Sequence, residues 1–255
     1  MFVVDLVSGV TQLHNITYIV CGLTSIISRF NSTTHQRLTN IHVKGLRFLW
    51  DIVACQLTSR IYFCDREKCI WRVSAVGEDI KLWLPKSPSD TFKPSRLSVT
   101  STRLLVTSFN THQLTQFDAE GNELSHVQLP DYINPYHAVE SPTGTFIISQ
   151  YNEQLEKNQL IEVNTAGQEL RQFSRSLSCT LQIAVDSHGN ILVADHNNRR
   201  ILLLDNHLSL RRVIIDEHHI INNSPWRLCY MEQSGQLLVG FDLSRQVAVF
   251  DVLRR

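Results

Sequence analysis

One hairpin-like pattern recurs six times along the chain and limits the folds that the chain can adopt. An apolar run leads into a short polar stretch, and a second apolar run follows that ends in Asp, Asn or Ser. The copy at 190–205, NILVADHNNRRILLLD, aligns without gaps on 103–118 and 236–251. Copies with small insertions lie at 15–31, 60–74 and 145–164. The polar end residues recur every 41 to 46 residues and are Asn31, Ser74, Asp118, Asn164, Asp205 and Asp251.

Each hairpin is flanked by two further apolar segments, so that every unit contains four expected strands. The upstream segments are 47–54, 95–100, 136–141, 181–186 and 226–231, with that of the first unit near 8–12. The downstream segments are 38–43, 79–84, 123–129, 169–173 and 210–216. A repeat of about 44 residues built from strands, without helical spacing of apolar residues, is typical of propeller blades.

The repeat therefore predicts an all-β chain that forms a single six-bladed β-propeller of four-stranded antiparallel blades. The last unit ends at 251–255, directly after its third strand, and FVVDLV at 2–7 has no place in the first unit. We expect this N-terminal segment to supply the outer strand of the sixth blade, because pairing the two chain ends removes an exposed sheet edge. The approximate blades are 8–43, 44–88, 89–130, 131–175, 176–219, and 220–255 together with 1–7.

The overall charge is balanced, with 24 basic and 24 acidic residues. No bulk field therefore directs the protein to nucleic acid or to an anionic membrane. Residues 1–10 lack the basic start of a secretory signal, and the longest apolar stretch, 16–27, is too short to span a bilayer as a helix. We expect a cytoplasmic protein without membrane association, and no heptad pattern indicates an oligomeric state.

The fifth unit carries the most distinctive residues. LQIAVDSHGNILVADHNNRRILLLD at 181–205 resembles an NHL repeat, and 225–251 is a weaker second copy. The resemblance implies a six-bladed propeller like the C-terminal one of tripartite-motif proteins. We expect structural roles for its polar residues, with acids and amides closing turns, glycine at positive φ and arginine pairing between blades. These residues are Asp186, Gly189, Asp195, Asn198, Arg200 and Asp205, with Ile183, Val185, Val193 and Ile201 as apolar matches.

Catalysis and metal binding find little support in the sequence. The six cysteines lack zinc spacing, although Cys64 and Cys69 flank an expected hairpin tip and could form a disulfide. A metal-dependent propeller lyase or lactonase needs several ligands that converge on the channel. Of the histidines only His137 lies at the start of an inner strand, and the acidic and amide candidates Asp51, Asn134 and Glu140 match no such motif. We expect no cofactor and no enzymatic activity, with this lyase or lactonase as a second alternative.

One face of the propeller should collect aromatic and basic residues, the types that anchor interfaces. The prediction is a non-catalytic recognition scaffold that binds a protein partner through this face, in the manner of the substrate-recognition part of a ubiquitin-ligase-type protein. The alternative is a propeller that binds single-stranded RNA by stacking and phosphate contacts. The candidates are Arg47, Trp50, Arg66, Lys68, Arg96, Phe109, Tyr136, His137, His196, Arg199, Trp226, Arg227, Phe241 and Arg245.

Overall fold

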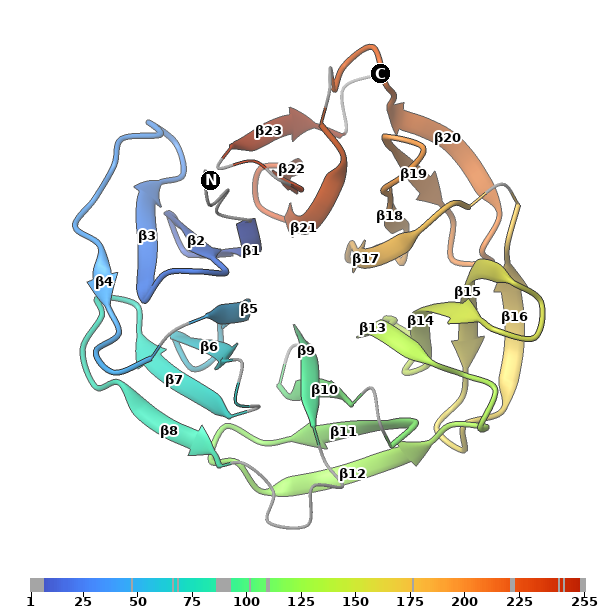
Figure 1. The fold of residues 1–255 in the computed structure, drawn as a ribbon, viewed down its shortest axis with the longest axis horizontal. Helices are drawn as coiled ribbons and strands as arrows, with labels where there is room; N and C mark the ends of the chain where they lie inside the picture. The colour runs from blue at the N-terminus through green and yellow to red at the C-terminus, as the bar shows by residue number, and fades with distance from the viewer. Residues whose placement is uncertain are drawn as a thin grey trace.

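The protein is a ring of six antiparallel sheets around a central channel (Figure 1). The computed structural model describes residues 7–46, 48–65, 67, 69–85, 93–100, 102–108, 111–175, 177–220, 223–242, 244 and 246–252. Every regular element among these residues is a β-strand. The predicted class of fold, an all-β six-bladed propeller, is confirmed.

Each blade is an up-and-down meander whose first strand lines the channel and whose last strand lies at the rim. Blade I contains β1 (Val7–Leu13), β2 (Ile16–Cys21), β3 (Ile26–Asn31) and β4 (Ile41–His42). Blade II contains β5 (Leu49–Cys55), β6 (Arg60–Asp65), β7 (Ile70–Ser74) and β8 (Lys81–Leu84). Blade III contains β9 (Pro94–Val99), β10 (Leu104–Ser108), β11 (Gln113–Phe117) and β12 (Glu123–Gln128).

The second half of the ring repeats this plan as far as β23. Blade IV contains β13 (Pro135–Glu140), β14 (Phe146–Asn152), β15 (Lys157–Val163) and β16 (Glu169–Phe173). Blade V contains β17 (Thr180–Val185), β18 (Ile191–Asp195), β19 (Arg200–Leu204) and β20 (Leu210–Ile215). Blade VI has three strands among the described residues, β21 (Pro225–Met231), β22 (Gln236–Phe241) and β23 (Val247–Asp251).

The second strand of a blade is buried on both faces because neighbouring blades cover it. All five residues of β10 and of β18 are buried, whereas the outer strand β12 buries only Val127. Fully covered strands read as continuous apolar runs rather than as alternating ones. This explains why the second strand of each unit is the strongest signal in the sequence.

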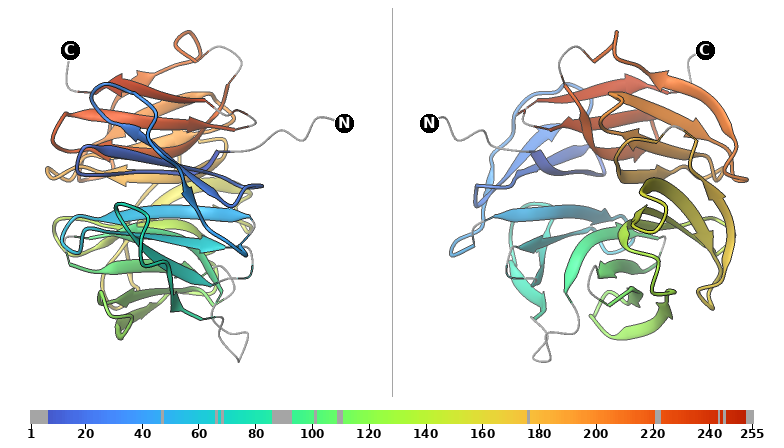
Figure 2. Two further views of the ribbon diagram at one scale, coloured as in Figure 1. Left: turned by 90° about the vertical axis from the view of Figure 1, so that its left-hand side faces the viewer. Right: turned by 45° about the vertical axis from the view of Figure 1, so that its right-hand side comes forward.

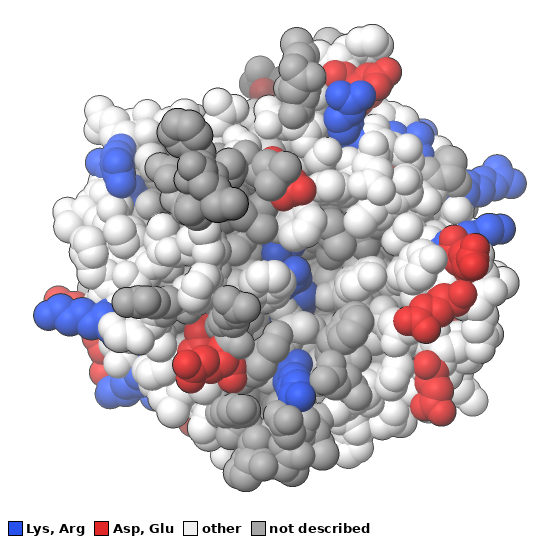
Figure 3. All heavy atoms as spheres, in the orientation of Figure 1, with Lys and Arg blue, Asp and Glu red and all other residues white. Residues whose placement is uncertain are grey.

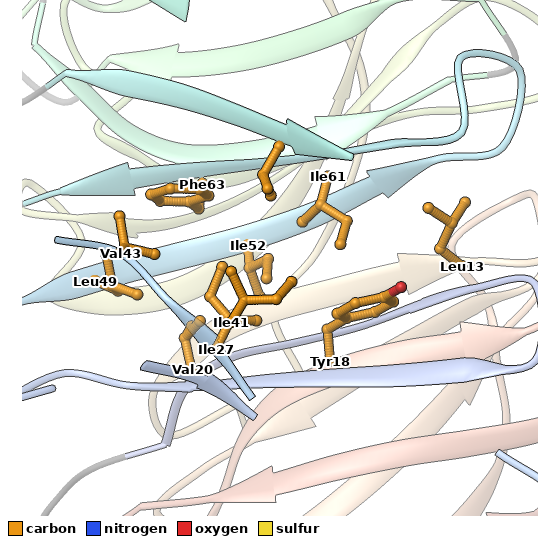
Figure 4. Packing of buried hydrophobic residues seen from close by; sticks show 11 residues of the cluster. Leu13, Tyr18, Val20, Ile27, Ile41, Val43, Leu49, Ile52, Ile61 and Phe63 are labelled. Carbon is orange, nitrogen blue, oxygen red and sulfur yellow. The ribbon is translucent and has the colours of Figure 1, made fainter. Parts of the chain in front are cut away.

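The core is divided into packets that lie between neighbouring blades. Between blades I and II, Val20 and Ile27 of one blade pack with Ile52 and Phe63 of the next (Figure 4). Tyr18 belongs to the same packet and donates its hydroxyl to the carbonyl of Ala75 at 2.8 Å. Each outer strand adds an apolar residue to the packet that faces the next blade; these residues are Ile41, Trp83, Val127, Phe173 and Ile215.

The two faces of the ring carry different loops. The connector face carries the chain segments that lead from one blade to the next and the turns between second and third strands. The turn face carries the turns between first and second strands, such as 14–15 and 56–59. Figure 2 shows the ring from its side, and Figure 3 views the connector face.

The structure bears on two expectations from the sequence, the N-terminal strand and the disulfide. The strand expected at 2–7 lies outside the described residues except for Val7, which begins β1 and pairs with Cys21. The disulfide considered for Cys64 and Cys69 is not formed in the structure. Cys64 lies in a buried strand, and Cys69 lies beyond the turn that follows that strand. Among the described residues, no helix is long and apolar enough to cross a membrane.

Candidate functional site

Six residues at one level of the channel form what we call the inner ring. Each lies near the start of a first strand, within or just after a register shift in its pairing with the second strand. Such a bulge re-aims the side chains that follow it. The inner ring consists of Gly9, Asp51, Arg96, His137, Gln182 and Arg227, and its five side chains are between 0% and 9% exposed.

Three inner-ring side chains accept a hydrogen bond from the backbone of the next blade. Oδ2 of Asp51 accepts from the N–H of Leu97 at 2.9 Å. Oε1 of Gln182 accepts from the N–H of Leu228 at 3.0 Å. Nδ1 of His137 accepts from the N–H of the residue that follows Gln182, at 3.4 Å. The acceptor position is the same in each blade, so the contact is a repeated device that joins neighbouring inner strands.

The remaining links complete a circuit through all six blades. Nε2 of His137 lies 3.3 Å from the carbonyl oxygen of Leu97, and it carries the ring proton because Nδ1 is an acceptor. Nε of Arg227 donates to the carbonyl of Ser8 at 2.5 Å, and Oγ of Ser8 donates to the carbonyl of Leu49 at 2.5 Å. The mouth of the channel is therefore held by hydrogen bonds that connect each inner strand to the next.

The inner ring concentrates charge in a buried place. Burial, together with the nearby Arg96 and Arg227, lowers the pKa of His137 to about 3, so this histidine is neutral at physiological pH. Burial raises the pKa of the Asp51 carboxyl, and the two arginines and two backbone N–H groups oppose that shift. The level of the ring thus holds two guanidinium groups and one carboxyl group. Figure 3 shows basic atoms at the centre of the connector face.

Aromatic residues lie directly above two of these arginines. The guanidinium carbon of Arg96 lies 5.0 Å from the ring centre of Trp50, and that of Arg227 lies 4.9 Å from the ring centre of Trp226. Both tryptophans occupy the bulge position that precedes the inner-ring residue, as Tyr136 does in blade IV. A cation over an aromatic face is favourable, most so when it is withdrawn from water. Trp50 remains 36% exposed and presents its ring to the connector face.

His196 extends this cluster toward the turn of blade V. Its ring meets Trp226 edge-on at 5.3 Å between centres, and its Nε2 lies 3.0 Å from Oδ2 of Asp242. Blades V and VI are thereby joined above the inner ring. The resulting surface consists of aromatic groups around a basic floor, and we call Trp50, Tyr136, His196 and Trp226 with Arg96 and Arg227 the mouth cluster.

The structure sorts the predicted face residues into three groups. Tyr136, His196 and Trp226 are half-buried on the connector face, where Arg199 is also half-buried and pairs with Glu217 at 3.5 Å. Those outside the described residues are Arg47, Arg66, Lys68, Phe109 and Arg245. Those that we expected on the surface but that the structure buries are Arg96, His137, Arg227 and Phe241.

The buried group has two physical causes. Arg96, His137 and Arg227 follow bulges that direct their side chains into the narrow mouth of the channel. Phe241 ends β22 and packs in the core packet between blades V and VI instead of lying in the adjacent turn. It is 5% exposed and offers no surface to a partner.

The polar residues of the NHL-like motif make turn contacts. Asp195 is fully buried and accepts hydrogen bonds from the N–H of Ser178, the amide of Asn198 and Nε of Arg200. Arg200 thus pairs with Asp195 of its own blade, at 2.7 Å. Asp186 accepts two backbone N–H bonds across the turn.

The same turn contains Gly189, which has φ +81°, a value that side chains disfavour. Asp205 accepts the N–H groups of His207 and Ser209 in the next turn of blade V. Acceptor side chains that close the turn after a strand thus recur within one blade, which is the use that the sequence pattern indicates.

Sequence reasoning missed the part of the channel that opens on the turn face. A cavity of about 580 Å³ lies below the inner ring, with His137 and Gln182 at its inner end. Its walls mix apolar residues such as Ile52, Leu97 and Leu228 with polar ones such as Gln12 and Thr100. The sequence does contain a signal for this cavity. The residues that follow the inner-ring position in a first strand alternate in the same way in every blade. No group of three or more metal-ligating residues occurs in the described part of the chain.

Comparison with known proteins bears on the fold. No protein-family model matches the chain, and no curated protein matches it significantly. Among solved structures, the WD40 β-propeller domain of Doa1 matches with a TM-score of 0.69 and 16% identity, covering 96% of this chain and 92% of that one. A chain from a nidogen/laminin complex matches with a TM-score of 0.68 and 12% identity, covering 89% and 85%. The class of protein is therefore a β-propeller, and at such identities the likeness concerns the fold alone.

Proposed function

We propose that the protein is a non-catalytic recognition scaffold that binds a segment of a partner protein at the mouth cluster. The propeller fold is typical of protein-interaction scaffolds. The observation that carries the proposal is the pairing of Trp50 with Arg96 and of Trp226 with Arg227 at the channel mouth. Tryptophan and arginine are the residues that most often dominate the binding energy of an interface.

The charges of the inner ring indicate the chemistry of the partner. Two guanidinium groups face one carboxyl group, and His137 contributes no charge at physiological pH. A partner segment with an acidic side chain beside an apolar one would complement this surface, because the acid meets the basic floor and the apolar group meets Trp50. The hydrogen-bond circuit holds the floor in place, so binding requires little ordering of the site.

The finer assignments follow from the resemblance to NHL repeats and are part of the same proposal. A role in substrate recognition by a ubiquitin-ligase-type protein would use this surface for a protein segment. Binding of single-stranded RNA would use the exposed aromatic ring for stacking. The protein-binding interpretation is favoured because Trp50 is the one exposed ring of the mouth cluster, whereas stacking of successive bases uses several such rings.

A peptide selection tests the proposal. Random peptides displayed on phage are selected against the wild-type chain, and the best binder is then measured on Trp50→Ala. We expect peptides with acidic residues beside an apolar one, and about 30-fold weaker binding to the variant, as for an interface tryptophan that contributes ~2 kcal/mol.

The matched control is Leu57→Ala, because Leu57 is 69% exposed and lies in the same blade on the turn face. We expect unchanged peptide binding for this variant. Binders that depend on Leu57 and not on Trp50 would refute the proposal. A uridine 20-mer that binds at low salt and is lost in Trp50→Ala, with no peptide selected, would replace it with the RNA-binding function.

A further inference from the structure

The cavity below the inner ring is closed at one end and open at the other. Its inner end is formed by inner-ring residues such as His137 and Gln182, which are almost completely buried. Its open end lies on the turn face, among polar residues such as His14, Gln56 and Gln233. The volume of about 580 Å³ falls within the range of small-molecule sites. A ligand would therefore enter from the turn face, on the opposite side of the ring from the mouth cluster.

Small side chains keep this part of the channel hollow. Alternate residues of a strand share one face, so the residue two positions after each inner-ring residue faces the channel as well. All six of these residues line the cavity, and none is larger than valine; they are Thr11, Val53, Ser98, Val139, Ala184 and Cys229. The side chains of the inner ring close the channel, whereas the small side chains below them leave space.

Two buried polar groups on the cavity wall lack a protein partner. Ser98 is 8% exposed, and its Oγ has no hydrogen-bond partner among the described residues. Gln182 is 6% exposed, and its Oε1 accepts from the N–H of Leu228. Its Nε2 makes no hydrogen bond within the described part of the chain. A polar group that is buried without a protein partner needs another explanation, which a molecule bound in the cavity supplies.

The free groups and the nearby charges determine the chemistry of the ligand. The amide nitrogen of Gln182 can only donate, and a serine hydroxyl can donate as well. The inner ring beside them carries two guanidinium groups against one carboxyl group, and Arg96 and Arg227 lie close enough to His137 to lower its pKa. Donors beside an excess of positive charge favour a carboxylate. The walls include apolar residues such as Leu228, which suit an aliphatic body.

We propose that this cavity is the binding site of a small aliphatic monocarboxylate, which enters the channel from the turn face. Its carboxylate accepts hydrogen bonds from Oγ of Ser98 and Nε2 of Gln182 at the inner end of the cavity. Its aliphatic body lies between the small side chains of the first strands. The site goes beyond recognition at the mouth cluster, because the two ligands approach the inner ring from opposite faces.

Titration of the isotope-labelled full chain with sodium hexanoate, followed by NMR, tests the proposal. We expect saturable amide shifts in β9, β17 and β21, the strands that carry Ser98, Gln182 and Leu228. Hexylamine has the same aliphatic chain and the opposite charge. It should bind at least about 10-fold more weakly, because it offers no acceptor to the two donors. Equal binding of both compounds, or no hexanoate shifts in these strands, would overturn the proposal.

Two variants remove the donors one at a time. Gln182→Glu keeps the acceptor for the N–H of Leu228 and replaces the free donor with a second oxygen. For this variant and for Ser98→Ala we expect about 10-fold weaker hexanoate binding, since each loses a hydrogen bond to a charged group. Thr111→Val is the matched control, because Oγ1 of Thr111 is another buried group without a partner among the described residues, in the turn between β10 and β11. Unaltered affinity in both donor variants would contradict the proposed contacts.

Two further readouts separate this site from a loss of structure and from the mouth cluster. Thermal unfolding of Ser98→Ala should match the wild type, because a buried hydroxyl without a partner does not stabilise the fold. A peptide selected at the mouth cluster should bind equally well with and without hexanoate, so that either proposal can fail alone. Displacement of the peptide by hexanoate would place both ligands at one site and would refute a separate site in the channel.

Discussion

At the scale of single residues, His137 connects three blades while remaining uncharged. It accepts from Ile183, donates to Leu97 and lies near Arg96 and Arg227, which disfavour its protonation. An imidazole that joins two backbones without adding charge suits a buried position between two cations. Gln182 performs the same acceptor role one blade further along.

The substitution His137→Gln should leave stability at pH 7 nearly unchanged and should remove part of its pH dependence. The folded-state pKa of His137 is about 3, below the unfolded value of 6.5, so below pH 6.5 the unfolded chain takes up a proton that the folded chain excludes. The free energy of unfolding therefore falls as pH decreases from about 6.5 to 3. At pH 5 the wild type should lose about 2 kcal/mol relative to the variant.

Urea unfolding of both proteins between pH 7 and pH 4 makes this comparison. Asp51 also titrates with a shifted pKa, in the opposite sense, but it is present in both proteins and cancels in the difference. Parallel stability curves for the two proteins would show that His137 is not held neutral.

The residue scale also shows why only part of the site could be predicted. Turn chemistry is local: Asp186 and Asp205 bond N–H groups two and four residues ahead, so the sequence pattern suffices to indicate their use. The burial of Arg96 and Arg227 depends on bulges, which are defined by pairing between strands. The sequence around an arginine at the start of a strand does not indicate the direction in which a bulge turns its side chain.

At the scale of the elements, the first strands of blades I and II approach closely at Gly9. A Cβ at this position would lie 2.7 Å from Cγ2 and 2.9 Å from the backbone nitrogen of Ile52. Gly9 is the one inner-ring residue without a side chain, and the Ser8 contact to Leu49 replaces the side-chain link used in other blades. The short distance between β1 and β5 allows that direct bond.

Gly9→Ala should therefore destabilise the protein by overpacking, by about 1–3 kcal/mol. Thermal or urea unfolding measures the effect. Gly144→Ala is the control, because a Cβ there meets nothing within 4 Å and only the φ of +81° opposes it. A loss in Gly9→Ala that is no larger than in the control would contradict close packing of β1 on β5.

The element scale is where the sequence was most informative. The second strands were predicted at their observed places because neighbouring blades bury both of their faces, which leaves long apolar runs. The outer strands carry one buried residue each and a weaker signal, as in β12. That β23 pairs only with β22 among the described residues is a property of strand pairing, which the sequence pattern of blade VI does not specify.

At the scale of the whole molecule, the fold is a ring of six blades whose inner strands are joined by hydrogen bonds. The hydrogen-bond circuit of the inner ring fixes the mouth cluster and crosses the seam between blades VI and I through Arg227 and Ser8. The structural likeness to a WD40 propeller at 16% identity shows that the repeat pattern, and not particular residues, defines this architecture. Function then depends on the side chains that the two faces of the ring carry.

The most direct measurement is hydrogen–deuterium exchange of the full chain with and without a peptide selected in the phage experiment. We expect slower exchange of the backbone around Trp50 and Trp226 and in the turn at 195–199, all on the connector face. The turns at 14–15 and 56–59 on the opposite face should be unaffected. Protection confined to those turns would place the ligand at the channel opening below the inner ring and would contradict recognition at the mouth cluster.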